Sequence, residues 1–137
     1  MTTINMQTMR YINLLDRVSR VKTMRCFSYN NAIVFVVPSH FMSQAVGVQG
    51  KHVQIIQNML GKRVKIVPDV RGIEDAKRFV QDVVEPLSFR SLEIGDNEIV
   101  ITAGGMHKAS LLGRNKIRLQ ELGQIVKDTF GKDLRII

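Results

Sequence analysis

The feature that most constrains the fold is a short segment that the chain contains twice. The stretch GKRVKIV at residues 61–67 is followed, at residues 131–137, by GKDLRII. Each reads Gly, Lys, any residue, apolar, basic, apolar, apolar, which is the pattern of a strand after a glycine. A chain of 137 residues is long enough for one ordinary domain or two very small ones. The repeat favours two small modules, each of which is only marginally stable alone.

The segments before the two strands occur in the same order. An amphipathic helix is predicted before each glycine, with apolar residues at helical spacing: Val53, Ile56 and Leu60 in 51–60, and Leu119, Leu122, Val126 and Phe130 in 116–130. Further back lie two short helical segments, 38–46 and 104–112. Each of these follows a pair of strands, 24–29 with 32–37 and 89–94 with 98–102, joined by turns at Asn30-Asn31 and 95–97.

One more helix is predicted at the start of each half. The first spans about 4–18, with Met9, Ile12, Leu15 and Val18 on one side, and the second spans about 73–84, with Ile73, Ala76, Val80, Val83 and Val84. Glu74 and Asp75 suit the start of that helix. The sequence therefore predicts an α+β fold in which the order helix, strand, strand, short helix, helix, strand occurs twice. The predicted modules are residues 1–68 and 69–137.

The positive charge of the chain is concentrated in the first half of the sequence. The net charge is +8, and residues 1–67 carry nine Lys or Arg against a single acid, Asp16. Residues 68–137 carry eleven of each sign, so the whole excess lies in the first half. A basic face favours a polyanionic partner such as nucleic acid, because binding releases counterions. Solubility alone is the other explanation, and a membrane surface is disfavoured because no basic amphipathic helix with bulky anchors stands out.

The most informative local motif is the tetrapeptide Gly47-Val48-Gln49-Gly50, which joins two predicted helices. Glycine lets a ligand backbone come close, and the following helix offers free N–H groups to a phosphate. Lys51 and His52 add charge or donors, and Val46, Val53 and Ile56 are expected to form an apolar wall for bases. Alone, the motif is weak and also suits a tight helix–helix turn. An aspartate at either glycine is expected to repel phosphate while leaving the fold intact.

In its six-element context this motif resembles the GXXG loop of a KH domain of the prokaryotic type (type II), a single-stranded RNA-binding module. QTMRYINLLDRV, RCFSYNNAIVFVVP, QAVGVQGKHVQIIQNMLGKRVKIV and VVEPLSF together resemble the small archaeal form of NusA. The resemblance implies two tandem KH domains, each αββααβ with a three-stranded mixed sheet. It also implies a role in transcription elongation, termination or antitermination, on nascent RNA and with RNA polymerase. The RNA-binding residues so predicted are Val46, Gly47, Val48, Gln49, Gly50, Lys51, His52, Gly113, Arg114, Asn115, Lys116 and Arg118.

The second loop departs from the family pattern at its last position. It reads Gly113-Arg114-Asn115-Lys116, with lysine where glycine is expected. Two interpretations stay open: this loop keeps RNA contact through Arg114, Lys116 and Arg118, or it is chiefly structural. In the first module, Lys62, Arg63 and Lys65 either line an approach path for RNA or form a solvated strand edge.

No catalytic or metal-binding pattern is found in the sequence. His40, His52 and His107 lack ligand spacing, and Cys26 is the single cysteine, so neither a zinc site nor an internal disulfide is predicted. We expect a non-enzymatic protein without cofactor, metal, small-molecule substrate or membrane partner. A polar N-terminus and one buried thiol suggest the cytoplasm. Two rival functions remain: a ribosome-associated or RNA-processing KH protein, and an adaptor that docks on polymerase with vestigial RNA binding.

Overall fold

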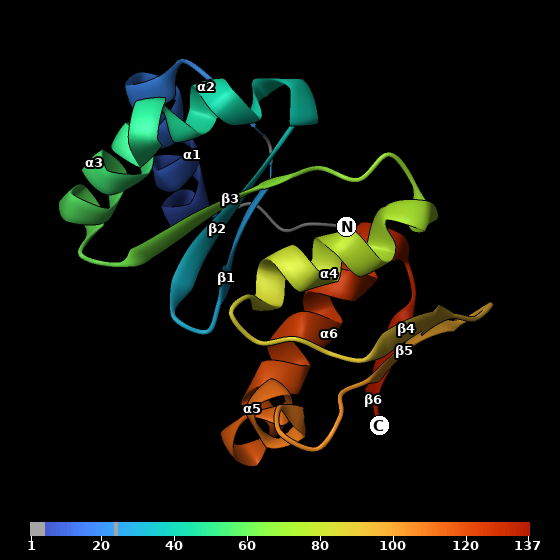
Figure 1. Ribbon diagram of the computed structural model, residues 1–137. Helices are drawn as coiled ribbons and strands as arrows, with labels where there is room; N and C mark the ends of the chain where they lie inside the picture. The colour runs from blue at the N-terminus through green and yellow to red at the C-terminus, as the bar shows by residue number, and fades with distance from the viewer. Residues whose placement is uncertain (1–4, 24) are drawn as a thin grey trace. The chain divides into compact units, whose positions relative to one another are not determined.

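The computed structural model describes residues 5–23 and 25–137, which fall into two compact units that meet in sequence at Asp69 and Val70 (Figure 1). Residues 1–4 and Met24 lie outside the described residues, so the expected starts of the first helix and of the first strand are not tested. The observed class is α+β, with two three-stranded mixed sheets.

In its described residues, the first unit contains three α-helices and one sheet. Its elements are α1 (Met6–Ser19), β1 (Arg25–Tyr29), β2 (Ala32–Val37), η1 (Ser39–Phe41), α2 (Met42–Val46), η2 (Val48–Gly50), α3 (Lys51–Leu60) and β3 (Arg63–Pro68). Asn5 caps α1, because its Oδ1 accepts a hydrogen bond from the Thr8 N–H at 2.8 Å. β1 runs antiparallel to β2, and β2 runs parallel to β3, so β2 is the central strand.

The core of this unit lies between the sheet and its helices. Alternate residues of β2, namely Ile33, Phe35 and Val37, pack with Leu15 of α1 and Ile56 of α3. These side chains are almost fully buried, and each contributes about 1.5–3 kcal/mol through the loss of apolar surface to water. Because Ala45 of α2 joins the same cluster, all three helices cover one face of the sheet.

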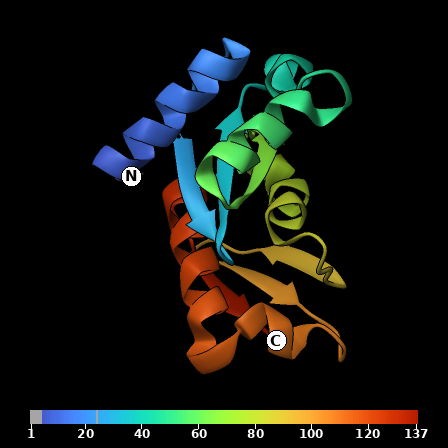
Figure 2. The same ribbon diagram turned by 90° about the vertical axis from the view of Figure 1, so that its left-hand side faces the viewer.

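The predicted core face of α1 is only partly correct. Leu15 is buried, and Ile12 and Val18 pack against the core, but the Met9 side chain is 52% exposed. Leu14 is buried in its place. Two phases of the apolar pattern compete in MQTMRYINLL, and the structure selects the face that carries Tyr11, Leu14 and Leu15. α1 lies at the edge of this unit, as the blue helix in Figure 2 shows.

The second unit repeats the element order. It contains η3 (Ile73–Asp75), α4 (Ala76–Val84), β4 (Ser91–Ile94), β5 (Glu98–Thr102), α5 (Lys108–Leu112), η4 (Arg114–Lys116), α6 (Ile117–Phe130) and β6 (Asp133–Ile136). β5 is central, antiparallel to β4 and parallel to β6. The buried core includes Ile99 and Ile101 of β5, Leu111 of α5 and Leu122 of α6.

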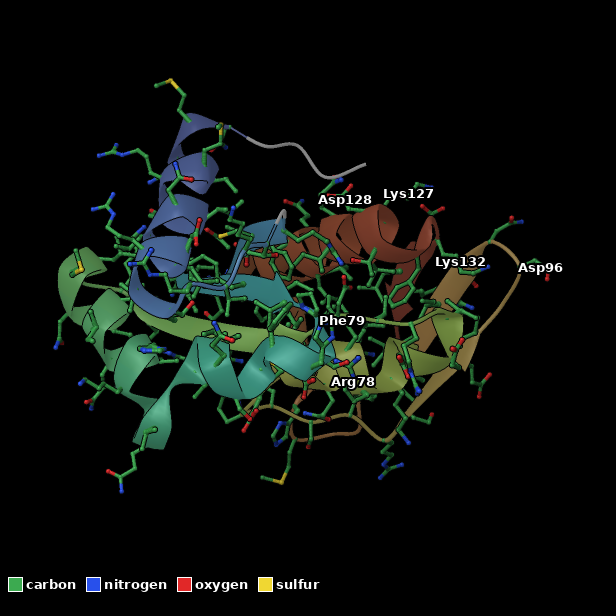
Figure 3. All side chains as sticks on the ribbon, turned by 90° about the horizontal axis from the view of Figure 1, so that it is seen from above. Arg78, Phe79, Asp96, Lys127, Asp128 and Lys132 are labelled. Carbon is green, nitrogen blue, oxygen red and sulfur yellow. The ribbon has the colours of Figure 1, made fainter. Side chains whose placement is uncertain are left out.

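The start of the second unit corrects one predicted core position. Ile73 was expected on the core face, but it lies in the 3₁₀ turn before α4 and is 37% exposed. Phe79 (labelled in Figure 3), which the predicted core face did not include, is fully buried. Its ring meets Phe130 edge to face, with ring centroids 5.9 Å apart. Asp75 lies at the helix start as predicted. The Arg71 guanidinium, which hydrogen-bonds its carboxylate, holds the pKa of Asp75 below its usual value.

The repeated Gly-Lys pair is a helix end followed by a parallel strand. Gly61 (φ 66°) and Gly131 (φ 70°) are left-handed C-caps of α3 and α6, and each donates its N–H to a carbonyl four residues earlier. The parallel strand begins two residues later, where Arg63 pairs with Ala32 and Asp133 pairs with Glu98. The two strands are therefore equivalent in register as well as in sequence.

One member of the second Gly-Lys pair has an added role. Lys132 Nζ donates to the carbonyl oxygens of Gly95 (2.9 Å) and Asp96 (2.7 Å), which fastens the β4–β5 turn to the end of α6 (Figure 3).

No helix in the described part of the chain combines the length and the apolar character that crossing a membrane requires.

Candidate nucleic-acid interface

Each unit has one turn between its two inner helices, and the two turns have the same backbone. Gly47 (φ 82°, ψ 166°) matches Gly113 (φ 75°, ψ 171°), and Gln49 (φ 54°, ψ 31°) matches Asn115 (φ 55°, ψ 28°). At the last position, Gly50 (φ 73°, ψ 21°) and Lys116 (φ 60°, ψ 27°) are both left-handed. The loop geometry is therefore present twice, although the second loop lacks the final glycine.

The two glycines of the first loop have different structural roles. A Cβ on Gly47 would lie 2.9 Å from the His52 backbone nitrogen and 2.8 Å from its Cγ, so no side chain fits there. Gly113 is in the same position, with the Arg118 backbone nitrogen 2.9 Å away. A Cβ on Gly50 would meet no atom within 4 Å. The expectation that aspartate at either glycine leaves the fold intact is therefore wrong for Gly47, because of that backbone contact, and is retained only for Gly50.

The turns leave backbone donors available. Gly47 donates its N–H to Ser43 O (3.0 Å) and Gly50 donates to Gly47 O (3.1 Å), as Gly113 and Lys116 do at the matching carbonyls. Across residues 5–23 and 25–137, no acceptor is found for the N–H groups of the two middle residues of either loop, which are Val48, Gln49, Arg114 and Asn115. Successive N–H groups at a turn that leads into a helix form a site for an anion.

Side chains around the first loop add one free charge and one fixed ring. Lys51 is exposed and forms no ion pair with a described residue. His52 is half-buried, and its Nδ1 lies 2.9 Å from the Gln44 carbonyl oxygen, so Nδ1 carries the hydrogen and donates it. Gln44 in turn donates from Nε2 to Ser19 O at 3.1 Å. Gln44 thus joins α1, α2 and the loop, and nothing in its sequence context indicates this role.

The predicted apolar wall needs correction. Ile56 is fully buried in the core and Val53 packs against that core, so Ile56 cannot touch a base. The apolar side chains available beside the loop are Val46, which is half-buried, and Val48, which is 83% exposed. Helical spacing identified the correct side of α3 for the core and therefore the wrong side for a ligand.

The second loop is more basic than the first. Arg114, Asn115 and Lys116 are exposed, and neither Arg114 nor Lys116 forms an ion pair within the described residues. Arg118 differs, because its guanidinium pairs with the Glu121 carboxylate one turn along α6. Two unpaired cations therefore remain on this loop, while the Arg118 charge is already partly neutralised.

Lys116 holds a backbone conformation that an L side chain disfavours. The left-handed region costs a residue with a Cβ about 1–2 kcal/mol. Its side chain is exposed, and Lys116 is absent from the ion pairs of the described chain. The second loop thus keeps the same shape as the first at a cost in stability, with an ammonium group at the position of Gly50.

Comparisons with known proteins found similar proteins at 20–22% sequence identity. The chain is 22% identical over 134 residues to a protein of Halococcus morrhuae named "Probable transcription termination protein NusA", covering 96% of this chain and 94% of that protein. The structure of the present chain resembles the crystal structure of APE1850 with a TM-score of 0.67 and 20% sequence identity. The match covers 98% of this chain and 100% of that one. No protein-family model matches the chain. The structural likeness shows a shared fold over nearly the whole chain.

Proposed function

We propose that the protein binds single-stranded RNA through two type II KH domains, residues 1–68 and 69–137, and acts in transcription in the manner of NusA. The observation that carries the proposal is the duplicated loop, with equal torsions, two free N–H groups in each copy and unpaired cations beside both. The distant similarity to a NusA protein supports the transcriptional role and a contact with RNA polymerase.

In the proposed mechanism, the sugar–phosphate chain lies against the turn at Gly47–Gly50. The Val48 and Gln49 N–H groups donate to a phosphate, and the N-terminal end of α3 and the Lys51 ammonium favour its negative charge. Bases lie against Val46 and Val48. The excess positive charge of the first half attracts the strand from a distance. Binding, not catalysis, is the proposed activity, and it takes place in the cytoplasm without metal or cofactor.

The test is RNA binding by Gly50→Asp. A carboxylate at this closest approach opposes a phosphate about 4 Å away at a cost of about 1–4 kcal/mol, so we expect affinity for single-stranded RNA to fall by about 5-fold to several hundred-fold. Gly50→Asn, which has nearly the same shape without the charge, separates repulsion from bulk.

Gly61→Asp is the matched control for backbone strain. Gly61 has nearly the same torsions (φ 66°, ψ 25°) and equally open space, but it lies at the other end of α3. The Gly61→Asp variant should bind RNA almost as tightly as the parent protein does. Equal binding by Gly50→Asp and the parent would refute the loop as the site, and weak parent binding that is insensitive to this change would support the adaptor alternative. Co-purification of polymerase or of ribosomal subunits from native extract separates a transcription factor from a ribosome-associated one.

A further inference from the structure

A second surface of the first unit lies away from the loop, in a groove between α1 and the last residue of α3. The groove has a volume of about 400 Å³. Exposed Arg10, Asn13 and Arg17 of α1 line it, together with Tyr11, Leu14 and Leu60, which are at least partly buried. It is therefore a groove with an apolar base and a polar, basic side (α1 is the blue helix beside green α3 in Figure 1).

The charge of this groove is uncompensated. Arg10 and Arg17 are two turns apart on α1, about 10 Å along the helix axis. Neither forms an ion pair with any residue in the described ranges, and no carboxylate lines the groove. Gln7 donates from Nε2 to the Tyr11 hydroxyl at 2.8 Å, which fixes the tyrosine. Two free guanidinium groups in such a setting bind carboxylates well, because each can form two parallel hydrogen bonds.

The same two helices also expose large apolar side chains. Met6 is 82% exposed, Met9 52% and Met59 60%. Methionine is flexible and polarisable, and it is common on surfaces that accept peptides of varied shape. Met9, which was predicted on the core face but is exposed, directly precedes Arg10 in the sequence of α1.

The groove and the loop are at opposite ends of α3. Lys51 begins this helix beside the loop, and Leu60 ends it in the groove. A helix of ten residues is about 15 Å long. A ligand in the groove therefore need not compete with a phosphate at Gly47–Gly50.

We propose that this groove binds an acidic peptide segment of a partner protein, whose carboxylates pair with Arg10 and Arg17 and whose apolar side chains lie on Leu14 and Leu60. A peptide fits better than RNA for two reasons. Residues 10–17 lie inside α1, where backbone N–H groups are already used, so the groove has no amide cradle for phosphate. Its apolar base is aliphatic, and its one aromatic ring, Tyr11, packs against the core instead of offering a stacking face.

The test uses a fluorescein-labelled peptide of about 12 residues, long enough for three helical turns, in which Leu recurs every three or four residues among Asp and Glu. One control peptide replaces the acids with Asn and Gln, and another replaces Leu with Ser. The protein variant is Arg10→Gln with Arg17→Gln. The matched control is Lys22→Gln with Lys77→Gln, which removes the same charge from two exposed, unpaired lysines outside the groove.

We expect the acidic Leu peptide to bind the parent, and the groove variant to bind it about tenfold more weakly than the control variant does. Amide shifts on titration should centre on residues 7–17 and Leu60, and Gly50→Asp should leave peptide affinity unchanged even where it abolishes RNA binding. An equal loss in both double variants would overturn the proposal, because it would show general charge attraction. A selective loss of RNA binding in the groove variant, without peptide binding, would assign the groove to RNA instead.

Discussion

The substitution Lys116→Gly tests whether Lys116 lowers the stability of the second unit while its side chain contributes to RNA binding. Glycine relieves the left-handed strain at φ 60°, about 1–2 kcal/mol, but adds about 0.5–1 kcal/mol of backbone entropy to the unfolded chain. The net expectation is a gain of roughly 0.5–1 kcal/mol in the free energy of unfolding of the second unit. For a unit of this size that gain corresponds to a rise in Tm of about 3–6 °C.

The same change should weaken RNA binding if the Lys116 ammonium contacts a phosphate. The slope of log K against log salt concentration should then become shallower by about 0.7, the value for one phosphate on a single strand. Fluorescence anisotropy with single-stranded RNA at several salt concentrations measures this slope, and calorimetry measures Tm.

Three control variants separate the two effects. Lys116→Arg keeps the charge and the strain, so both readouts should stay near those of the parent. Lys116→Asn tolerates the left-handed region but lacks the charge, so it should bind like Lys116→Gly. Gln49→Gly (native φ 54°) relieves similar strain without removing a charge. An unchanged or lower Tm in Lys116→Gly would refute the strain argument, and unchanged or tighter RNA binding with an unchanged slope would show that the lysine makes no phosphate contact.

Two further predictions concern the first unit. Gly47→Ala should destabilise this unit by about 2–4 kcal/mol, because of left-handed strain and the contact with the His52 backbone. Gly50→Ala should cost only about 1 kcal/mol, because a Cβ there meets no neighbouring atom. Thermal denaturation compares the two variants, and equal losses of stability would contradict the geometry. Burial raises the pKa of the Cys26 thiol to about 12, so iodoacetamide at about pH 8 should modify the native protein far more slowly than the unfolded one. Because the unfolded thiol ionises first, the stability that this group contributes is complete below about pH 8.5 and is lost as the pH rises toward the folded pKa. Cys26→Ala should remove that part of the pH dependence, and rapid native labelling would contradict the burial argument.

Local patterns were enough to predict most of the architecture. α3 spans Lys51–Leu60 as predicted, and Asn30 and Asn31 take the positive φ values that their turn requires. The two Gly-Lys segments predicted matching strands, and each of those strands pairs in parallel with the equivalent central strand. Elements with weak local signals were less well predicted: β4 begins at Ser91, two residues after the expected start, and helical structure in the segment 104–112 is confined to Lys108–Leu112 as an α-helix.

The positions of the two candidate loops were predicted from the sequence, but their internal geometry was not. The sequence placed both loops between two helices and marked the lysine that replaces glycine in the second. It did not separate Gly47, which needs to be glycine because of the His52 backbone, from Gly50, which faces open space. It also did not show that Arg118 pairs with Glu121, or that Ile56 is buried too deeply to contact a base.

The amino-acid sequence by itself determined the order of the elements, the duplicated glycine turns and the concentration of positive charge in the first half, because each depends on residues close together in the chain. The tertiary structure alone decided which of the two competing apolar faces of α1 is buried, at which glycine an added side chain would collide with the backbone, and which arginines are left without a partner. Those properties depend on atoms that folding brings together from separate segments, as Leu60 meets α1 to form the groove beside Arg10 and Arg17.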